Sequence, residues 1–247
     1  MIAETENKQI VQDDNFYADV FRVFKDNEIA TLSTSDWFNC HMSSLNGQRN
    51  STSPFRMLSI GCGDGQIDNE IVAHLYDYSQ PLIEYVGVDT NLVHLEEASK
   101  NLQHHGLSTQ FIHSTVEEYL LSNKNDKEFD LIIAVHCFYY IPERKETLEK
   151  LVQCLKEGGK LVVVYHSAAG IHFFQKMTNR IVGNSTTKVQ VSALEIEDIL
   201  SSLDVLFRVN IENVVIDVSS CMKKPLSQDG LKLLSFFLER DIRKESL

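Results

Sequence analysis

Residues 57–68 read MLSIGCGDGQID, and residues 85–89 read YVGVD. In the first stretch an apolar run stops at three glycines spaced two apart, and a helical pattern follows. The second stretch is an apolar run that ends in the carboxylate of Asp89. A strand–helix–strand unit uses this arrangement to hold an adenosine-type cofactor. The two stretches therefore predict a binding site as well as a fold.

The glycines and the carboxylate have separate physical roles. A residue without a Cβ lets the backbone turn sharply and approach a ligand, and the next helix begins with unpaired N–H groups. The carboxylate of Asp89 can accept hydrogen bonds from both hydroxyls of a ribose. The spacing G-x-G-x-G differs from the dinucleotide fingerprint G-x-G-x-x-G. The cofactor residues that we predict in this region are Gly61, Gly63, Gly65, Asp89, Thr90 and His94.

Length and charge restrict the class of protein. The chain has 247 residues, of which 43% are hydrophobic, and this suits one α/β domain with a large core. Its formal net charge is −12, and Lys and Arg are not clustered. We therefore expect no nucleic-acid partner and favour a small or cationic substrate.

Other features of the sequence exclude several kinds of site. The first residues, MIAETE, are acidic and polar, and no apolar run approaches the roughly 18 residues that span a bilayer. We therefore expect a cytoplasmic protein without a membrane partner. The five cysteines are scattered without a C-x-x-C pair, so they indicate neither a disulfide framework nor a zinc site. His94 and the pair His104 and His105 fit no standard ligand spacing, so we expect no metal.

Strands and helices are predicted to alternate through the middle of the chain. The predicted strands are 56–60, 83–88, 110–113, 129–135 and 160–165. The predicted helices are 66–78, 92–104, 116–122 and 144–155, and a turn is predicted over 156–159. This alternation with short connections predicts a doubly wound, mostly parallel sheet of the Rossmann-like kind.

The flanking segments are predicted to complete a single domain over 1–247. We expect an N-terminal helical cap over 1–42, a cofactor-binding core over 55–166 and a substrate-side region over 167–247. Within the flanks, helices are predicted over 10–24, 31–40, 171–182, 193–203 and 229–242, a linker over 43–54 and a β-rich segment over 207–218.

His136 directly follows the strand predicted over 129–135. In a doubly wound sheet, ligands bind beyond the carboxyl ends of the strands, near the point where the strand order reverses. The first and fourth strands flank that point, so we expect His136 beside the transferable group. The alternative is a histidine whose ring is satisfied by the backbone at the end of a strand.

Other candidate residues follow the same edge. Tyr139 and Tyr140 can wall a pocket and make cation–π contacts with an ammonium or sulfonium group, or else cover the sheet edge. Thr115 and Val116 begin a predicted helix where an adenine would rest. His166 ends the fifth predicted strand and is placed on the substrate side by that position alone.

The chain resembles the histamine N-methyltransferase family of class I S-adenosylmethionine-dependent methyltransferases. The G-x-G-x-G spacing matches the first motif of class I enzymes, and Ser59 stands where most of them have an acid, as it does in this family. Residues 129–140 match the family's strand followed by paired tyrosines. The other matching segments are 167–170, 215–221 and 230–239.

The resemblance assigns roles by position. It implies that Gly61 and Asp89 hold the methionine and ribose parts of the cofactor, that Val135 contacts the adenosine, and that His136 faces the amine. Tyr17, Phe21 and Phe24 fall on a helix that closes over the pocket in the family. The family's acidic substrate anchor corresponds either to Glu28 or, in an ungapped alignment, to Ala30.

Two positions depart from the family. Ile171 stands where the family has a tryptophan, and the family's last strand has no counterpart in this sequence. We therefore expect an open sheet edge that the helix over 229–242 or a second copy of the chain covers, which would make a homodimer.

These observations together predict an enzyme that transfers a methyl group from S-adenosylmethionine to a small amine-bearing metabolite. A neutral nitrogen would attack the methyl group in line, His136 would orient the nucleophile or accept its proton, and Tyr139 and Tyr140 would shape the pocket. His136, Tyr140 and His166, with Tyr17, Phe21, Phe24 and Glu28, are the predicted substrate contacts. The alternatives are a small-molecule O-methyltransferase and a non-catalytic subunit with the same fold.

Overall fold

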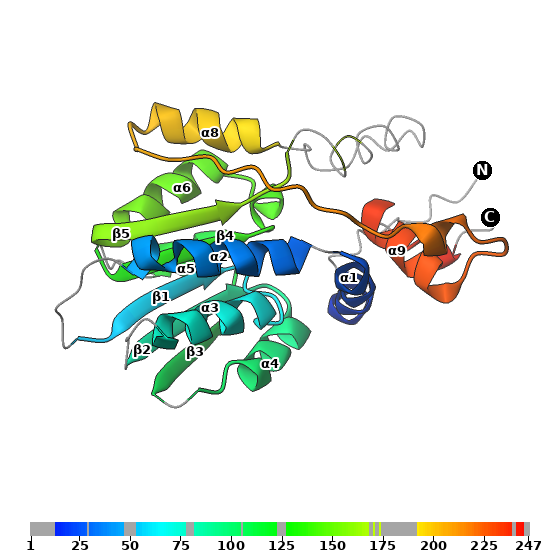
Figure 1. Cartoon of the computed structure of the whole chain (residues 1–247), viewed down its shortest axis with the longest axis horizontal. Coiled ribbons are helices and arrows are strands. Elements are labelled where there is room, and N and C mark those ends of the chain that lie inside the picture. The colour runs from blue at the N-terminus through cyan, green and yellow to red at the C-terminus, as the bar shows by residue number, and fades with distance from the viewer. Residues whose placement is uncertain are drawn as a thin grey trace. The chain divides into compact units, whose positions relative to one another are not determined.

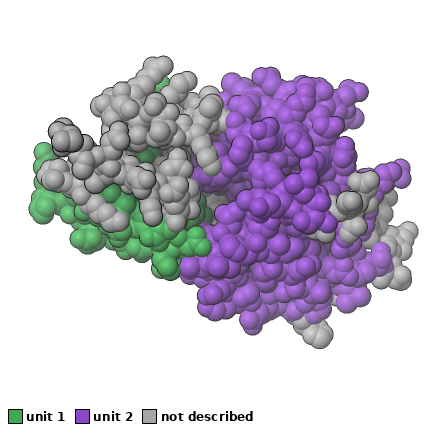
Figure 2. All heavy atoms as spheres, turned by 180° about the vertical axis from the view of Figure 1, so that it is seen from behind, with its two compact units in different colours: residues 1–33, 170–190, 211–247 green, residues 34–169, 191–210 purple. Residues whose placement is uncertain are grey.

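The computed structural model describes residues 13–28, 30–46, 53–77, 82–104, 106–122, 127–167, 170, 173, 192–238 and 241–244. These residues fall into two compact units (Figure 2). We call residues 34–169 and 191–210 the sheet unit, and residues 1–33, 170–190 and 211–247 the helical unit. The expectation of one domain over 1–247 stays a prediction.

The sheet unit is built on five parallel strands in the order β3-β2-β1-β4-β5 (Figure 1). Their bounds are β1 (Phe55–Ile60), β2 (Ile83–Asp89), β3 (Leu107–His113), β4 (Phe129–Val135) and β5 (Leu155–Val164). β1 pairs with both β2 and β4, so the strand order reverses between β1 and β4. The predicted doubly wound parallel sheet is confirmed, and so is the place of its reversal.

Helices cover both faces of this sheet. From Thr34 onward, α2 (Ala30–Asn46) packs on one face together with α3 (Gln66–Asp77) and α4 (Leu92–Asn101). The other face is covered by α5 (Val116–Ser122), α6 (Arg144–Gln153) and α8 (Ala193–Ser202). A sheet covered on both faces needs apolar residues at successive positions of its strands, as at Met57 and Leu58 in β1 and from Leu131 to Ala134 in β4.

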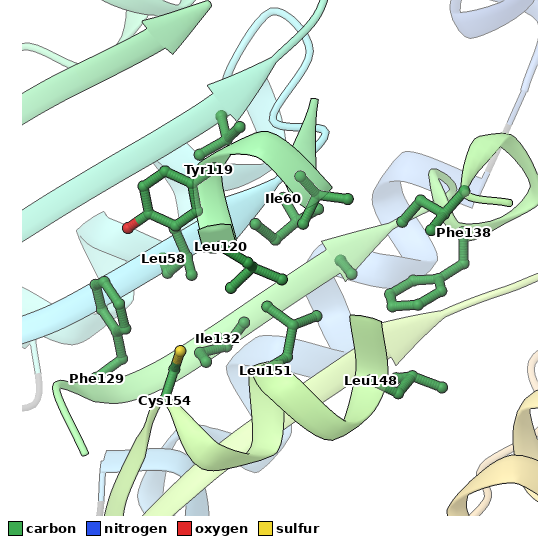
Figure 3. Packing of buried hydrophobic residues seen from close by; sticks show 14 of the residues in the cluster. Leu58, Ile60, Tyr119, Leu120, Phe129, Ile132, Phe138, Leu148, Leu151 and Cys154 are labelled. Atoms are coloured by element: carbon green, nitrogen blue, oxygen red, sulfur yellow. The ribbon is translucent and has the colours of Figure 1, made fainter. Parts of the chain in front are cut away.

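Successive residues of the central strands enter two separate cores. Leu131 and Ile133 pack with α2, α3 and α4, whereas Ile132 packs with α5 and α6. Figure 3 shows this second core, in which Ile132 lies among Tyr119 of α5 and Leu151 of α6. The alternation follows from the two-residue repeat of a β-strand, and both cores hold β4 in place from opposite sides.

The helical unit contains α1 (Asp14–Asn27) and α9 (Gln228–Leu238), with the short helices η3 (Ser219–Met222) and η4 (Ile242–Lys244). The rings of Phe24 and Phe236 stack with centroids 4.2 Å apart and join α1 to α9. Lys232 Nζ lies 2.9 Å from Asp19 Oδ1 across the same pair of helices. The Asp13 side chain caps α1 by accepting a hydrogen bond from Phe16 N–H at 3.1 Å.

Some predicted boundaries were wrong. The helix predicted over 31–40 extends from Ala30 to Asn46, so the first four residues of the predicted linker 43–54 are helical. Burial of Phe38, Met42 and Leu45 against the sheet overrides the polar composition of this segment. The helix predicted over 10–24 is α1, which ends later, at Asn27, and the helix predicted over 229–242 is α9, which ends at Leu238.

The last strand begins earlier than predicted. Leu155 pairs with Phe129 and Lys160 pairs with Leu131, so residues 156–159 lie between paired positions. The predicted turn 156–159 therefore interrupts β5 instead of preceding it. Gly158 has a φ of +77°, which L-residues with a side chain rarely adopt.

The β-rich segment predicted over 207–218 was wrong as a strand. In the structure it forms a single antiparallel bridge, between Ile216 and Glu28. The side chains of Ile211 and Val215 are 83% and 62% exposed. An alternating apolar pattern becomes a strand only where a neighbouring strand supplies hydrogen bonds, and the described residues supply one bridge here.

Parts of two predictions lie outside the described residues. These are positions 47–52 of the linker and, apart from Phe173, the helix predicted over 171–182. Among the described residues, no helix has both the length and the apolar character needed to cross a membrane. The covering of the sheet edge by the C-terminal helix or by a second copy stays a prediction.

Charged residues close the amino end of the sheet, and they allow a test of its stability. Asp130 is 8% exposed, and its Oδ2 accepts hydrogen bonds from Arg56 N–H and from Lys156 Nζ, both at 2.8 Å. We expect Asp130→Ala to lower the free energy of unfolding by about 1.5–3 kcal/mol, because the half-buried Lys156 ammonium and the backbone N–H group of Arg56 lose a nearly buried acceptor. Glu146→Ala, which breaks an exposed pair with Lys150, should lower it by about 0.5 kcal/mol or less. Urea denaturation measures both, and equal losses would contradict this account.

Candidate active site

The glycine turn, residues 61–65, links β1 to α3 and reaches the end of β2. The backbone N–H groups of Gly61 and Cys62 both donate to the carbonyl of Val88, at 2.8 and 3.2 Å. Gly61, Gly63 and Gly65 have φ values of +61°, +55° and +70°. A residue with a Cβ is strained in this region, so the three glycines are required by the backbone conformation of the turn.

The Asp89 carboxylate holds this turn in place. Its Oδ2 accepts a hydrogen bond from Gly63 N–H and its Oδ1 accepts one from Asn91 N–H, both at 2.8 Å. Each carboxylate oxygen has two acceptor sites, so these two bonds leave capacity for hydroxyl groups of a ligand. Asp89 therefore holds the turn in place, a structural role that the sequence did not predict. Its role as the acceptor for ribose hydroxyls stays a prediction.

Space for a ligand is present beside the same carboxylate. A Cβ built on Gly63 meets no protein atom within 4 Å. A Cβ built on Gly61 would lie 2.5 Å from the Cβ of Cys137, and one on Gly65 would lie 2.6 Å from Leu102 Cδ1. The turn is thus closely packed at Gly61 and Gly65 and open at Gly63.

Residues after β2 and β3 continue the edge next to Asp89. Ser114 N–H donates to the Asp89 carbonyl at 3.1 Å, and His113 Nε2 lies 2.9 Å from the Thr90 carbonyl. Thr115 caps α5, because its Oγ1 accepts from Glu118 N–H at 3.2 Å. Val116 and His94 are buried, and Thr90 is exposed. The structure therefore places Thr90, Thr115 and Val116 at the predicted edge, while the ring of His94 lies in the interior near the start of α4.

His136 follows β4 with an unusual backbone conformation. Its φ is +51°, and its N–H donates to the carbonyl of Val164 at 3.0 Å, which ties the end of β4 to the end of β5. Val135, the last residue of β4, pairs with Val164 in the ladder. The Nδ1 atom of His136 is buried and has no hydrogen-bond partner in the described part of the chain. A buried polar atom without a partner is unfavourable unless a ligand or water satisfies it.

His136 belongs to a group of aromatic side chains, which we call the histidine–tyrosine cluster. Its ring stacks on His166 with centroids 4.6 Å apart, and His166 stacks on Tyr139 at 5.6 Å with planes 6° apart. Tyr139 also contacts Tyr140 and Tyr165, at 4.8 and 5.4 Å, with its ring edge-on to theirs. The structure thus brings together four predicted residues, and Tyr165 is a member that the sequence analysis missed.

Burial sets the charge state of this cluster. It lowers the pKa of His136 to about 3, and the neighbouring His166 lowers it further in the same direction. Burial also raises the pKa of Tyr165, whose hydroxyl has no hydrogen-bond partner among the described residues. His136 is therefore neutral at physiological pH, and its imidazole can accept or donate a hydrogen bond without carrying charge.

Cys137 connects the histidine–tyrosine cluster to the glycine turn. Its thiol lies 3.1 Å from the carbonyl of Ile60 and donates to it, and its Cβ occupies the space that a side chain at Gly61 would need. Residues 138–140 then form the short helix η2 (Phe138–Tyr140), anchored by the buried ring of Phe138. The two predicted halves of the site, the turn and His136, are therefore neighbours.

Four predicted substrate residues lie in the helical unit. Tyr17 and Phe21 stack with centroids 5.8 Å apart, and Phe21 stacks with Phe24 at 6.3 Å, so the aromatic stripe of α1 is packed within this unit. Burial raises the pKa of Glu28 to about 7, and the charge of Lys25 opposes that shift. Their roles in substrate binding, and the closure of α1 over a pocket, stay predictions.

Sequence reasoning missed further residues of the site. Asn91, which is buried and caps α4 by accepting from His94 N–H, carried a signal, because Asn before an apolar helical run is a typical N-cap. Cys137 and Tyr165 gave no signal of this kind, because their importance comes from contacts between different strands. Among the described residues no three His, Cys, Asp or Glu side chains form a group that could hold a metal ion.

Comparisons with known proteins agree with this geometry. The chain matches the methyltransferase domain family over residues 51–196. It belongs to this family. Its methyl donor is S-adenosylmethionine, and the methyltransferase BamL, whose solved structure contains SAH, shares the fold with a TM-score of 0.52 at 16% identity over 79% of this chain and 72% of that one.

Two relatives of this methyltransferase are named for different activities. The malonyl-(acyl-carrier protein) O-methyltransferase of Brevibacillus brevis is 33% identical over 106 residues, which are 43% of this chain and 36% of that relative. The match thus spans little more than a third of that relative's length. Histamine N-methyltransferase A of Xenopus laevis is 21% identical in an alignment of 258 positions, gaps included, which covers 96% of this chain and 84% of that relative.

The residues present fit S-adenosylmethionine. The space at Gly63 lies next to the Asp89 carboxylate, which has the acceptor capacity that ribose hydroxyls need. The helix that follows the turn, α3, begins at Gln66 and presents its N–H groups toward the same turn. The Asp89 carboxylate can therefore accept from the ribose hydroxyls of this cofactor, and the N–H groups at the start of α3 can donate to its carboxylate.

Three glycine substitutions separate binding from folding. Gly63→Ala and Gly158→Ala each place a Cβ in open space at positive φ, so both should destabilise the fold by about 1–2 kcal/mol through backbone strain alone. Only Gly63→Ala should also weaken S-adenosylhomocysteine binding, by about tenfold or more, measured by calorimetry. Gly61→Ala should destabilise the fold further than either, because its Cβ meets Cys137. Unchanged affinity in Gly63→Ala would show that the cofactor does not occupy the turn.

Proposed function

We propose that this methyltransferase acts on the nitrogen of a small amine, and that His136 orients that nitrogen. The cofactor would be held by Gly61, Gly63, Gly65 and Asp89. The observation that carries the proposal is the buried, unpartnered Nδ1 of a neutral imidazole next to the glycine turn. An N–H group of an acceptor would satisfy that atom.

The chemistry divides between the cofactor and the protein. When bound, S-adenosylmethionine supplies an electrophilic methyl group on a sulfonium. The protein would bring an acceptor nitrogen into line with that group and keep water away from it. The high effective molarities of well-oriented intramolecular reactions show that positioning alone can accelerate such a reaction greatly. The rings of Tyr139 and Tyr140 would flank the acceptor and favour its partial positive charge.

The low pKa of His136 favours one of its two predicted roles. A base with a pKa of about 3 holds a proton weakly at pH 7, so it is poorly suited to remove one from an amine. A neutral Nδ1 lone pair can still accept a hydrogen bond from a neutral amine and direct the nitrogen lone pair. We therefore assign His136 to orientation of the nucleophile.

Relatives support two acceptor chemistries. Similarity to histamine N-methyltransferase A extends over 96% of this chain and supports nitrogen as the acceptor. The higher identity to a malonyl-(acyl-carrier protein) O-methyltransferase, over 43% of the chain, supports a carboxylate oxygen as the second candidate. The first similarity extends over almost the whole chain and the second over less than half of it, so we favour nitrogen.

A turnover screen distinguishes these candidates. The protein is incubated with S-adenosylmethionine labelled in its methyl group and with separate panels of biogenic amines, imidazoles, guanidines and small carboxylates. Label on nitrogen is the expected result, and it should increase with pH up to the pKa of the acceptor, because His136 stays neutral throughout. Label restricted to carboxylate oxygen would overturn the proposal.

Substitutions at His136 test its role. His136→Ala should lower kcat by about tenfold to a hundredfold, while the affinity for S-adenosylhomocysteine stays within about twofold. His136→Asn tolerates the positive φ and places an amide oxygen close to the position of Nδ1, so it should retain most of the activity. If His136→Asn is as inactive as His136→Ala, the ring acts as a base or packs in a way that an amide cannot reproduce. If His136→Ala retains full activity, His136 has no part in the reaction.

A further inference from the structure

A buried carboxyl group lies beneath the glycine turn. Asp68, in the first turn of α3, is 4% exposed, and the Tyr85 hydroxyl donates to its Oδ1 at 2.9 Å. Tyr85 comes from the middle of β2 and is itself 1% exposed. The side chain of Ser59 in β1 also hydrogen-bonds the Asp68 carboxyl. Three elements that meet at the turn are thus joined through one acid.

The Tyr85 hydroxyl connects this acid to the turn itself. The Tyr85 hydroxyl and the Cys62 thiol both lie over Gly87, where an added Cβ would be 2.8 Å from the hydroxyl and 3.0 Å from the sulfur, and the thiol donates to the Gly63 carbonyl at 3.8 Å. Burial raises the pKa of the Cys62 thiol, so the thiol is protonated and acts as a donor. Cys62 is adjacent to Gly63, whose N–H group is held by Asp89.

The direction of these hydrogen bonds depends on the charge of Asp68. An ionised carboxylate only accepts, so the Tyr85 hydroxyl must donate to it, which fixes the orientation of the hydroxyl beside the Cys62 thiol. A protonated carboxyl can donate to the Tyr85 oxygen instead, so it leaves the direction of this hydrogen bond open. The ionised form therefore specifies one orientation of the Tyr85 hydroxyl below the turn.

We propose that Asp68 and Tyr85 are positioning residues for the cofactor, which fix the glycine turn through Cys62 in the shape that binds S-adenosylmethionine. They lie below the turn and act on the cofactor through Cys62 and Gly63. The proposal depends on the cofactor and is independent of which acceptor receives the methyl group.

The ionised acid reduces the stability of the fold. Burial raises the pKa of Asp68 to about 6, above the roughly 3.9 of an unfolded chain, and the nearby charge of Asp64 adds to that shift. The folded state therefore binds the proton more tightly, and the stability gained from it is lost as the pH rises from about 4 through 6. A buried carboxylate that opposes folding at neutral pH, and that orders the hydrogen bonds below a binding turn, is consistent with a role in binding.

The test measures cofactor affinity and stability in the same variants. Asp68→Asn keeps the shape of the side chain without its charge, and Asp77→Asn makes the same charge change at an exposed position of α3. At pH 7.5, calorimetry should show about tenfold weaker binding of S-adenosylhomocysteine for Asp68→Asn and unchanged binding for Asp77→Asn. The melting temperature of Asp68→Asn should equal or exceed that of the wild type.

The pH dependence and a second variant complete the test. Wild-type affinity should fall between about pH 7 and 5, relative to Asp68→Asn, as Asp68 gains its proton. Other carboxylates near the turn, Asp64 and Asp89, are present in both proteins, so the difference between the two profiles reports Asp68. Tyr85→Phe should weaken binding similarly, and the double variant should be no weaker than either single variant, because both act through one link.

Two outcomes would overturn the proposal. The first is wild-type binding by Asp68→Asn at every pH, which would make the acid irrelevant to the cofactor. Alternatively, affinity and melting temperature could fall together in both variants, which is the result for residues that only support the fold. Either outcome leaves the proposal for the methyl acceptor unaffected, because no acceptor is present in the binding experiment.

Discussion

Both oxygens of the Asp89 carboxylate accept hydrogen bonds from backbone N–H groups, at Gly63 and Asn91. Through them, one side chain at the end of β2 fixes the turn that follows β1 and the start of α4. The glycine turn also packs against Cys137, and this contact places His136 beside the turn. The turn that we propose binds the cofactor and the histidine–tyrosine cluster thus depend on the same carboxylate and on three glycines that tolerate positive φ.

This arrangement is suited to methyl transfer because it is fixed before any ligand binds. The backbone of the turn is held by Val88 and Asp89, and the ring of His136 is held by stacking on His166. A rigid site requires little ordering when its ligands arrive, so more of the binding energy remains for alignment of the reacting atoms. The Nδ1 atom of His136 is buried and has no hydrogen-bond partner among the described residues, which is energetically unfavourable for the fold until a ligand supplies one.

Local patterns in the sequence predicted the parallel sheet, the place where its strand order reverses and the glycine turn. They succeeded because the middle parts of β1 and β4 carry apolar residues on both faces and because positive φ strongly favours glycine. They failed for residues 207–218, where a strand-like pattern has one bridging partner. They also missed Tyr165 and the link from Asp68 to Tyr85, because these depend on side chains that meet only after β1, β2, β4 and β5 are in register.

Calorimetric titration of S-adenosylhomocysteine into the wild type, Asp89→Ala and Asp64→Ala tests the central claim most directly. Asp64 belongs to the same turn, and its carboxylate accepts a local hydrogen bond from Gln66 N–H at 3.2 Å. The account predicts that Asp89→Ala weakens binding by about tenfold or more, because charge-assisted hydrogen bonds to the ribose and to the turn are lost, and that Asp64→Ala binds within about twofold of the wild type. Equal affinity in Asp89→Ala and the wild type would contradict the account, because the cofactor would then bind without the carboxylate on which this site is built.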